Sequence, residues 1–515
     1  MNSIFHNKSF PIKVAPVVIR TERVRGPPKS KSSLSDETKS KLKSRDGQKA
    51  SSTNKNQREF YPHSLTEDKV DNKISHRKSR IVKKRPLTSL DSDTSDSENN
   101  IVIGVKSFKR RELSSLVDKK RNICLENAFS GHSASIAEMI HAAAIVSSEN
   151  RSKKKTDGDA IVTLDLKYPS SDSERFLFST NKEFGTRLTI RYRYALIFGN
   201  DFNPAEEIIN VIKVVLDFYF AKDQAICLKD SEKGLIRKLN KYYNIFARNV
   251  TDIKPLFEFK NTVEIYNSAI EKEISNGTFI RNLGSAHHIP LYMVEFILQQ
   301  TYSRAVSPNV EILKKYENGT DNVYGELLPP FVSKILYESG LTSEGVFVDL
   351  GSGVGNVVLQ AALEFGCESW GCEILENVAA LAESQKKEFD LRCQLWGIKP
   401  GSVHLEHGDF LENKKIHVAM QRADVILVNN QAFTPVLNQN LKDLFLDVKD
   451  GCRIISLKSF LPYGQQISTR NLWDPANLLD VTEAEYHSRS VSWTDAGGRY
   501  YIARKDEKRL MCFNE

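Results

Sequence analysis

The sequence lacks the signals of a membrane-spanning, secreted or zinc-stabilised protein. It has no run of about eighteen apolar residues, and its N-terminus has no signal-peptide pattern. Its seven cysteines are odd in number and include no CxxC pair. Neither a disulfide framework nor a metal module is therefore indicated, and a reducing intracellular compartment, with no membrane contact, is expected.

Large apolar residues are also scarce from residue 1 to about residue 155, where Ser, Lys and Arg dominate. Such a segment cannot bury enough apolar surface to offset the entropy of ordering it, so we expect a disordered tail over 1–155. Basic residues gather there in short clusters, at 76–80, 83–85, 109–111, 119–121 and 153–155. They predict binding to a polyanion, foremost DNA. A solvated tail or a nuclear localisation signal is the simpler alternative.

Residues 156–320 have the composition of an ordinary folded domain. Alternating apolar residues at 160–164 and 187–190 predict short strands. Asn203-Pro204-Ala205-Glu206 has the capping residue and early proline of a helix start, and apolar residues continue at helical spacing to Phe218. Further helices are expected near 231–246, 261–275 and 290–302. We therefore predict a mainly helical domain with short strands.

From Gly345 onward, strand and helix patterns alternate. Strands are expected at 345–350, 369–374, 403–410, 423–430 and 453–458, and helices at 354–365, 376–395 and 436–448. Two more strand-like runs, near 478–485 and 499–503, have no helical pattern between them. This layout predicts an α/β fold for 321–515: a doubly wound, seven-stranded, mostly parallel sheet with a reversed last strand, the plan of class I methyltransferases.

A glycine-rich turn follows the first of these strands, in Val348-Asp349-Leu350-Gly351-Ser352-Gly353-Val354-Gly355-Asn356. A ligand can approach bare backbone at such a turn. Dinucleotide enzymes use G-x-G-x-x-G to hold pyrophosphate, whereas here the third glycine comes one residue early. Asp349, directly before the turn, disfavours a pyrophosphate and suits a cationic sulfonium. The pattern favours S-adenosylmethionine (AdoMet) over NAD.

The next two strands end in further candidate ligand groups. Glu373 closes the second strand, where nucleotide-binding α/β folds place an acid that accepts from both ribose hydroxyls. Asp409 and Phe410 close the third, where Phe410 can stack on adenine and Asp409 can bind its amino edge. For Asp409, capping of the loop is an equally good explanation.

Six motifs in a fixed order resemble one family. They are Tyr324-Gly325-Glu326-Leu327, the turn at 349–356, Gly408-Asp409-Phe410, Val428-Asn429-Asn430 with Ala432-Phe433, Ser456-Leu457-Lys458-Ser459-Phe460, and Ser490-Val491-Ser492-Trp493-Thr494. The sequence resembles the disruptor-of-telomeric-silencing family, the histone H3 lysine methyltransferases without a SET domain. Its basic N-terminal extension is similar to that of the fungal members.

The resemblance implies a nuclear enzyme that transfers one, two or three methyl groups from AdoMet to a core-domain lysine of histone H3 in nucleosomes, with a role in telomeric silencing. It implies that AdoMet is held by Tyr324, Gly325, Glu326, Leu327, Phe347, Val348, Asp349, Leu350, Gly351, Ser352, Gly353, Val354, Gly355, Asn356, Glu373, Asp409 and Phe410. It places Asn429 beside the methyl group and the incoming amine. Phe433, Trp493 and Tyr500 are expected along the lysine channel.

Two positions in the channel wall depart from the family pattern: Gln431 stands where animal members have an aromatic residue, and Leu427 replaces another. Two alternative functions share parts of this pattern. Adenine-N6 nucleic-acid methyltransferases also place Asn or Asp at the end of the fourth strand, but they follow it with Pro-Pro and an aromatic residue, which Asn429-Asn430-Gln431 lacks. A chromatin-tethering protein that has lost activity is disfavoured by the intact Asp349, Glu373 and Asn429.

Overall fold

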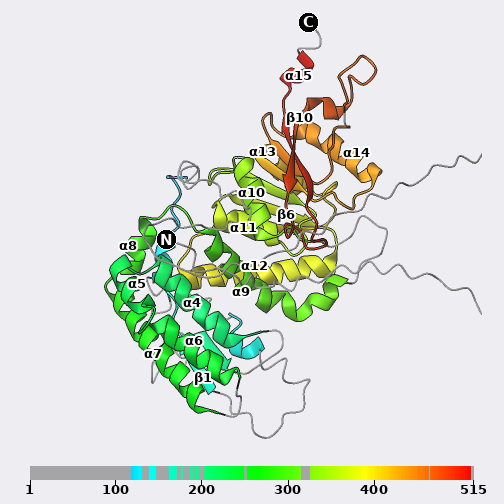
Figure 1. Cartoon of the computed structure of the whole chain (residues 1–515). Coiled ribbons are helices and arrows are strands. Elements are labelled where there is room, and N and C mark those ends of the chain that lie inside the picture. The colour runs from blue at the N-terminus through cyan, green and yellow to red at the C-terminus, as the bar shows by residue number, and fades with distance from the viewer. Residues whose placement is uncertain are drawn as a thin grey trace, which may run out of the picture. The chain divides into compact units, whose positions relative to one another are not determined.

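The computed structural model (Figure 1) describes residues 118–129, 139–145, 162–170, 175–177, 186–188, 192–196, 202–248, 252–314, 325–462 and 464–511. All of these ranges belong to one compact unit. Most of the expected basic tail, including four of its five charge clusters, lies outside the described residues. Within the described ranges, no helix is long and apolar enough to cross a membrane.

The second half of the chain folds around a seven-stranded sheet in the order β10-β11-β9-β8-β5-β6-β7. The strands are β5 (Val346–Leu350), β6 (Glu368–Glu373), β7 (Val403–His407), β8 (Val425–Val428), β9 (Arg453–Ser456), β10 (Leu479–Tyr486) and β11 (Gly498–Lys505). Strands β5 to β9 pair in parallel, and β11 runs antiparallel to β9 and to β10. The predicted doubly wound sheet with a reversed strand is confirmed.

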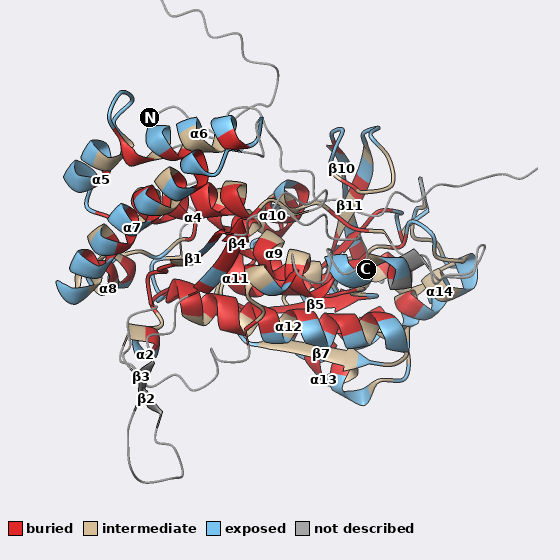
Figure 2. Ribbon diagram, turned by 90° about the horizontal axis from the view of Figure 1, so that it is seen from below, coloured by how far each residue is buried: buried red, intermediate tan, exposed pale blue. Residues whose placement is uncertain are grey.

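The order of the strands reverses at β5, which has β6 on one side and β8 on the other. Every residue of β5 is buried, as a strand covered on both faces requires; Figure 2 shows this central strand in red. Ligands of open α/β sheets bind at the carboxyl ends of the strands beside such a reversal. The fold therefore directs attention to the segments that follow β5 and β8.

Helices cover both faces of the sheet. One face packs on α10 (Pro329–Glu338) and α11 (Asn356–Glu364), through Phe347 of β5. The other packs on α13 (Lys414–Arg422) and α14 (Pro435–Leu444), through Val348 and Leu350. The sequence pattern did not indicate α10 or α13 individually. In α13, only Ile416, Ala419 and Met420 face the core, too few for a clear signal.

The first half of the described chain is mainly helical, as expected. Its helices are α4 (Pro204–Phe218), α5 (Lys222–Lys229), α6 (Leu235–Phe246), α7 (Lys254–Ser275), α8 (Thr278–Gly284) and α9 (Leu291–Ala305). Asn203 caps α4 by accepting a hydrogen bond from the amide of Glu206. Two short antiparallel pairs join β1 (Val162–Leu166) with β4 (Tyr192–Leu196) and β2 (Arg175–Leu177) with β3 (Thr186–Leu188).

The helical part and the sheet part share one hydrophobic core. This core contains residues of α4, α7 and α9 together with Leu359 and Leu363 of α11 and Trp396 of α12 (Glu376–Trp396). The Trp396 indole is fully buried, and its Nε1 donates to Gln300 of α9 at 3.1 Å. The helical part and the sheet part therefore bury their apolar side chains in one continuous core.

A buried polar network crosses the same junction. Arg304 of α9 bonds Glu207 of α4 at 2.5 Å, and Arg392 of α12 bonds Glu388 at 2.7 Å. The hydroxyl of Tyr192 accepts from both guanidinium groups, at 3.0 and 2.7 Å. Burial alone would raise the pKa of Glu207, but the charge and hydrogen bonds of Arg304 outweigh it and hold that pKa below its usual value.

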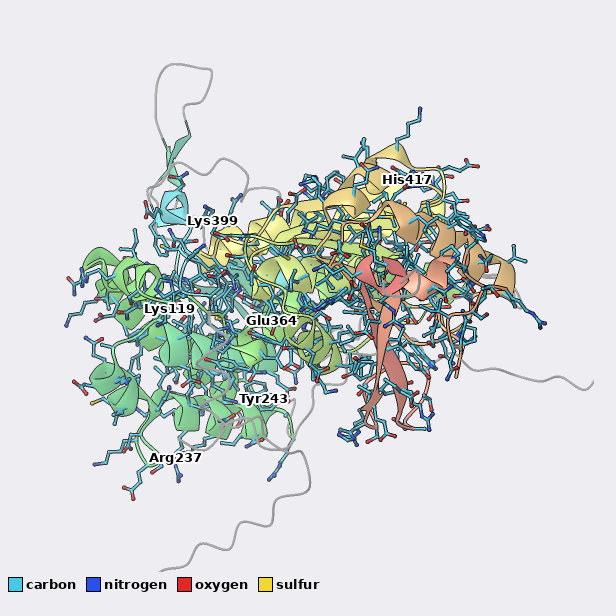
Figure 3. All side chains as sticks on the ribbon, turned by 90° about the horizontal axis from the view of Figure 1, so that it is seen from above. Lys119, Arg237, Tyr243, Glu364, Lys399 and His417 are labelled. Carbon is cyan, nitrogen blue, oxygen red and sulfur yellow. The ribbon has the colours of Figure 1, made fainter. Side chains whose placement is uncertain are left out.

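Part of the range expected as a disordered tail belongs to this folded unit. Residues 118–129 and 139–145 are described, and Ile123 and Cys124 lie in the shared core. Arg121, a member of one of the basic clusters, is 6% exposed and donates to the backbone carbonyls of Leu363 and Glu364. Figure 3 labels Lys119, two residues before Arg121, and Glu364, the last residue of α11. This arginine therefore closes the end of α11 instead of facing a polyanion.

Candidate active site

A cavity of about 570 Å³ opens at the carboxyl ends of β5, β6 and β8. Its volume is in the range of cofactor pockets. The cavity brings together predicted site residues that are far apart in the sequence: Gly325, Glu326, Leu327, Asp349, Gly351, Ser352, Gly353, Val354, Asn356, Glu373, Asp409, Phe410, Asn429 and Phe433. Within the described residues, no group of three or more His, Cys, Asp or Glu could hold a metal ion.

The glycine turn forms the floor of the cavity at the end of β5. Gly351, Gly353 and Gly355 all have positive φ, at 87°, 56° and 85°, which only glycine adopts without strain. The amides of Gly351 and Ser352 donate to the carbonyl of Cys372, which ties the turn to β6. The spacing G-x-G-x-G therefore follows from the backbone path, because each glycine occupies a left-handed position.

Two carboxyl groups face the cavity from adjacent strands. Asp349 is 3% exposed, and burial, followed by the nearby charge of Glu373, raises its pKa to about 8. Burial also raises the pKa of Glu373, although its carboxylate accepts from the amides of Leu375 and Gly353, each at 2.9 Å. The buried Asp349 and the half-buried Glu373, which form no ion pair among the described residues, suit a positively charged ligand that also offers hydroxyl donors.

Asn429 and Asn430, which directly follow β8, have different roles. Asn430 is fully buried, and its Oδ1 accepts from the amides of Leu457 and Lys458, so it holds the loop after β9. Asn429 lines the cavity and donates from Nδ2 to the carbonyl of Gly325 at 3.2 Å. Its Oδ1 is buried and has no hydrogen-bond partner among the described residues. A buried, unpaired carbonyl oxygen is costly, which indicates a missing donor.

Aromatic side chains border the cavity on its β7 and β8 side. The rings of Phe410 and Phe433 lie nearly parallel, with centroids 6.4 Å apart and an interplanar angle of 26°. Asp409 lines the cavity and also accepts from the amide of Leu411 at 2.8 Å. It therefore performs the capping function considered for it and also lines the cavity.

Several predicted site residues lie outside the cavity. Phe347, Val348 and Leu350 point into the two cores beside β5, because a contiguous stretch of strand cannot direct every side chain to one site. Gly355 packs against Leu405. Tyr324 lies outside the described residues. Phe347, Val348 and Leu350 therefore support the site through core packing, and Gly355 supports it through the path of the backbone.

Tyr500 and Trp493 are both expected along the lysine channel, and Trp493 contacts a residue that lines the cavity. Tyr500 is fully buried against α10, where its hydroxyl donates to Glu338 and accepts from Lys334 at 2.5 Å. The structure thus places Tyr500 away from the cavity. Trp493 is half-buried and lies directly on Gly325, beside the cavity.

The comparisons with known proteins agree with this geometry. The family model described as "Histone methylation protein DOT1" matches residues 302–504. A protein of Aspergillus fumigatus named histone-lysine N-methyltransferase, H3 lysine-79 specific, is 40% identical over 97% of this chain and 95% of its own length. The chain belongs to the DOT1 family. A protein of the same name from Emericella nidulans is 46% identical over 77% of this chain and 76% of its own, and one from Gibberella zeae is 42% identical over 86% of each.

The DOT1 match extends from the end of α9 to β11 and includes every residue that lines the cavity. The sequence pattern had missed several of these lining residues: Val357, Ile374, Leu375, Val378, Leu411, Thr434 and Leu437. Most are apolar residues that directly follow a strand or begin the next helix. Their position after the strand ends was the available signal, since a ligand pocket needs apolar walls as well as polar groups.

Proposed function

We propose that this chain is a histone-lysine N-methyltransferase that uses AdoMet to methylate a lysine of histone H3. Its fungal relatives carry that function in their names. The observation that carries the proposal is that Asn429, whose buried Oδ1 has no hydrogen-bond partner among the described residues, lines the same cavity as the buried Asp349 and the half-buried Glu373. The amide oxygen of Asn429 can accept a hydrogen bond from an N–H donor, and the carboxyl groups of Asp349 and Glu373 can bind a cation.

The residues present fit AdoMet. Asp349 suits its cationic groups, because a cation lowers the pKa of a buried carboxyl and removes the cost of its charge. Glu373 keeps acceptor capacity for ribose hydroxyls, and the apolar residues around Phe410 suit an adenine. When bound, AdoMet would supply an electrophilic methyl group. A bond from the amine nitrogen to the methyl carbon would replace the bond from that carbon to sulfur, so that S-adenosylhomocysteine leaves and the methylated amine loses a proton.

The protein's main task is to deliver that amine in its neutral form. A free lysine has a pKa near 10.4, so only about one in two thousand is neutral at pH 7. A dry, partly aromatic wall formed by Phe433 and Trp493 penalises the ammonium form. The carbonyl of Asn429 accepts an amine N–H and so aims the lone pair away from itself, and alignment of this kind accelerates a displacement without a strong base.

The finer parts of the proposal rest on the sequence. The nucleus is the expected location, and the nucleosome the expected substrate. The basic clusters in residues 1–117 would bind nucleosomal DNA and raise the local concentration of the enzyme. The proposed division of the chain assigns a tail to 1–155, a helical domain to 156–320 and a methyltransferase domain to 321–515. Residues 118–129 and 139–145 of the tail range belong to the folded unit.

A labelled-methyl assay tests this function. The full chain, AdoMet labelled on the methyl group, and nucleosomes, free histones or DNA alone are incubated separately. Label on histone H3, located to a lysine by mass spectrometry, is the expected result. Replacing Asn429 with Ala should lower transfer about 100-fold while AdoMet still binds, and replacing the exposed Asn440 of α14 should change nothing. Label on DNA, or no transfer to any substrate, contradicts the proposal.

A further inference from the structure

Two segments that are far apart in the sequence pair beside the cavity. Leu327 and Val491 form an antiparallel bridge. The amide of Leu328 donates to the carbonyl of Ser490, and the amide of Ser492 donates to the carbonyl of Glu326, each at 2.9 Å. The Ser492 hydroxyl also accepts from the amide of Glu326 at 2.9 Å. The first segment lines the cavity, and the second carries Trp493.

Gly325 lies where this pair meets the cavity, and it contacts two functional side chains at once. Its carbonyl accepts from Nδ2 of Asn429 at 3.2 Å. A Cβ added to Gly325 would lie 2.7 Å from Cε3 and 3.1 Å from Cζ3 of Trp493, so the indole rests on the bare Cα. Gly325 is not among the glycines with positive φ. Space for the indole, and not an unusual backbone angle, is what requires glycine here.

The hydrogen bond from Asn429 to Gly325 fixes which end of the Asn429 amide is left to accept a further hydrogen bond. With Nδ2 held by the carbonyl of Gly325, Oδ1 is left as the unpaired acceptor. If the amide rotated by half a turn, it would present N–H donors to the incoming amine. These donors would bond to the amine lone pair and take it out of reaction.

We infer that Gly325 is a positioning residue for the amine side of the site: its carbonyl orients the Asn429 amide, and its missing side chain sets the position of the Trp493 indole. This inference rests on the proposed function. It assigns to Gly325 a role distinct from cofactor binding, since a change there should impair the transfer step far more than the affinity for AdoMet.

The test compares Gly325→Ala with Gly284→Ala in the full chain. Gly284 is a suitable control because nothing lies within 4 Å of its added Cβ. For Gly325→Ala, kcat on nucleosomes should fall about 10- to 100-fold, because a displacement of about 1 Å costs that much. The Kd for AdoMet, measured by calorimetry, should stay within about twofold, the usual scatter between independent sites. Gly284→Ala should match the wild type in both.

The clash with Trp493 provides a second and independent measurement. Trp493→Leu removes the two atoms that the new Cβ would meet. In that background, adding Gly325→Ala should lower kcat by no more than about twofold, because the two changes remove the same contact. Ser492→Ala removes the hydrogen bond to the amide of Glu326 without adding bulk, and it should lower kcat while the Kd for AdoMet stays unchanged. This variant tests the same role if Gly325→Ala does not fold.

The outcomes separate the two proposals. A wild-type chain that neither binds AdoMet nor transfers methyl overturns the proposed function itself. An active wild type with an unaffected Gly325→Ala variant overturns only the positioning role. Equal losses from Gly325→Ala with and without the Trp493 indole, or a loss confined to AdoMet affinity, also overturn it.

Discussion

The raised pKa of Asp349 predicts that AdoMet affinity depends on pH. Burial and the charge of Glu373 raise this pKa to about 8, so in the free protein roughly one carboxyl in a hundred is ionised at pH 6 and half at pH 8. A cationic ligand binds the ionised form, and its charge then keeps the carboxyl ionised. Association should therefore strengthen as pH rises, by at most about 50-fold between pH 6 and pH 8, and level off above.

Calorimetry on the wild type and on Asp349→Asn measures this effect. The ligand's own amino group titrates near pH 8, but it does so with both proteins and cancels in the ratio of their dissociation constants. That ratio should grow with pH up to about 8. Asp443→Asn, a change at an exposed carboxyl of α14, should leave the wild-type profile unaltered. A ratio that stays constant from pH 6 to pH 8 refutes the assignment of the titrating group to Asp349.

Three further predictions concern stability, the cofactor and the tail. The pKa of Asp349 is higher in the folded than in the unfolded protein, so the contribution of this carboxyl to stability is lost as pH rises toward 8. Asp349→Asn should therefore raise the melting temperature of the ligand-free protein at pH 8 but not at pH 4. Glu207→Gln, which leaves the buried Arg304 without its charge partner, should lower the free energy of unfolding by about 3 kcal/mol in urea titrations; a value near zero would show that the network is not stabilising. Deletion of residues 1–117 should leave the AdoMet Kd unchanged but reduce nucleosome methylation and its salt dependence, and equal activity at all salt concentrations would refute DNA binding by the tail.

Local sequence signals were sufficient for the sheet and for much of the cavity. A buried strand followed by glycines that need left-handed angles specifies the turn at 351–355 by itself, and the acids at strand ends follow from the register of a parallel sheet. The mostly parallel order and the reversed strand β11 were predictable because consecutive βα units have few ways to connect.

Relations between distant segments were not predictable in this way. The bond between Asn429 and Gly325 joins residues 104 positions apart, and no periodicity reports it. Arg121 belongs to a basic cluster, yet it is buried because the carbonyls at the end of α11 need donors there. The side on which Tyr500 packs depends on the register of β11 against β9 and on Lys334 and Glu338 of α10. Each of these is a property of tertiary contacts.

The buried network at Tyr192 sets a limit on how this enzyme can be shortened. Cutting the chain at residue 320 would remove Gln300 and Tyr192, the partners of Trp396 and Arg392, and expose to water a face of α12 that was built for an interior. The part of the chain that holds the sheet and the cavity therefore cannot be separated from the helical part without exposing buried surface. Experiments on a minimal enzyme should retain the chain from residue 118 onward, because Arg121 is buried and Ile123 and Cys124 belong to the shared core.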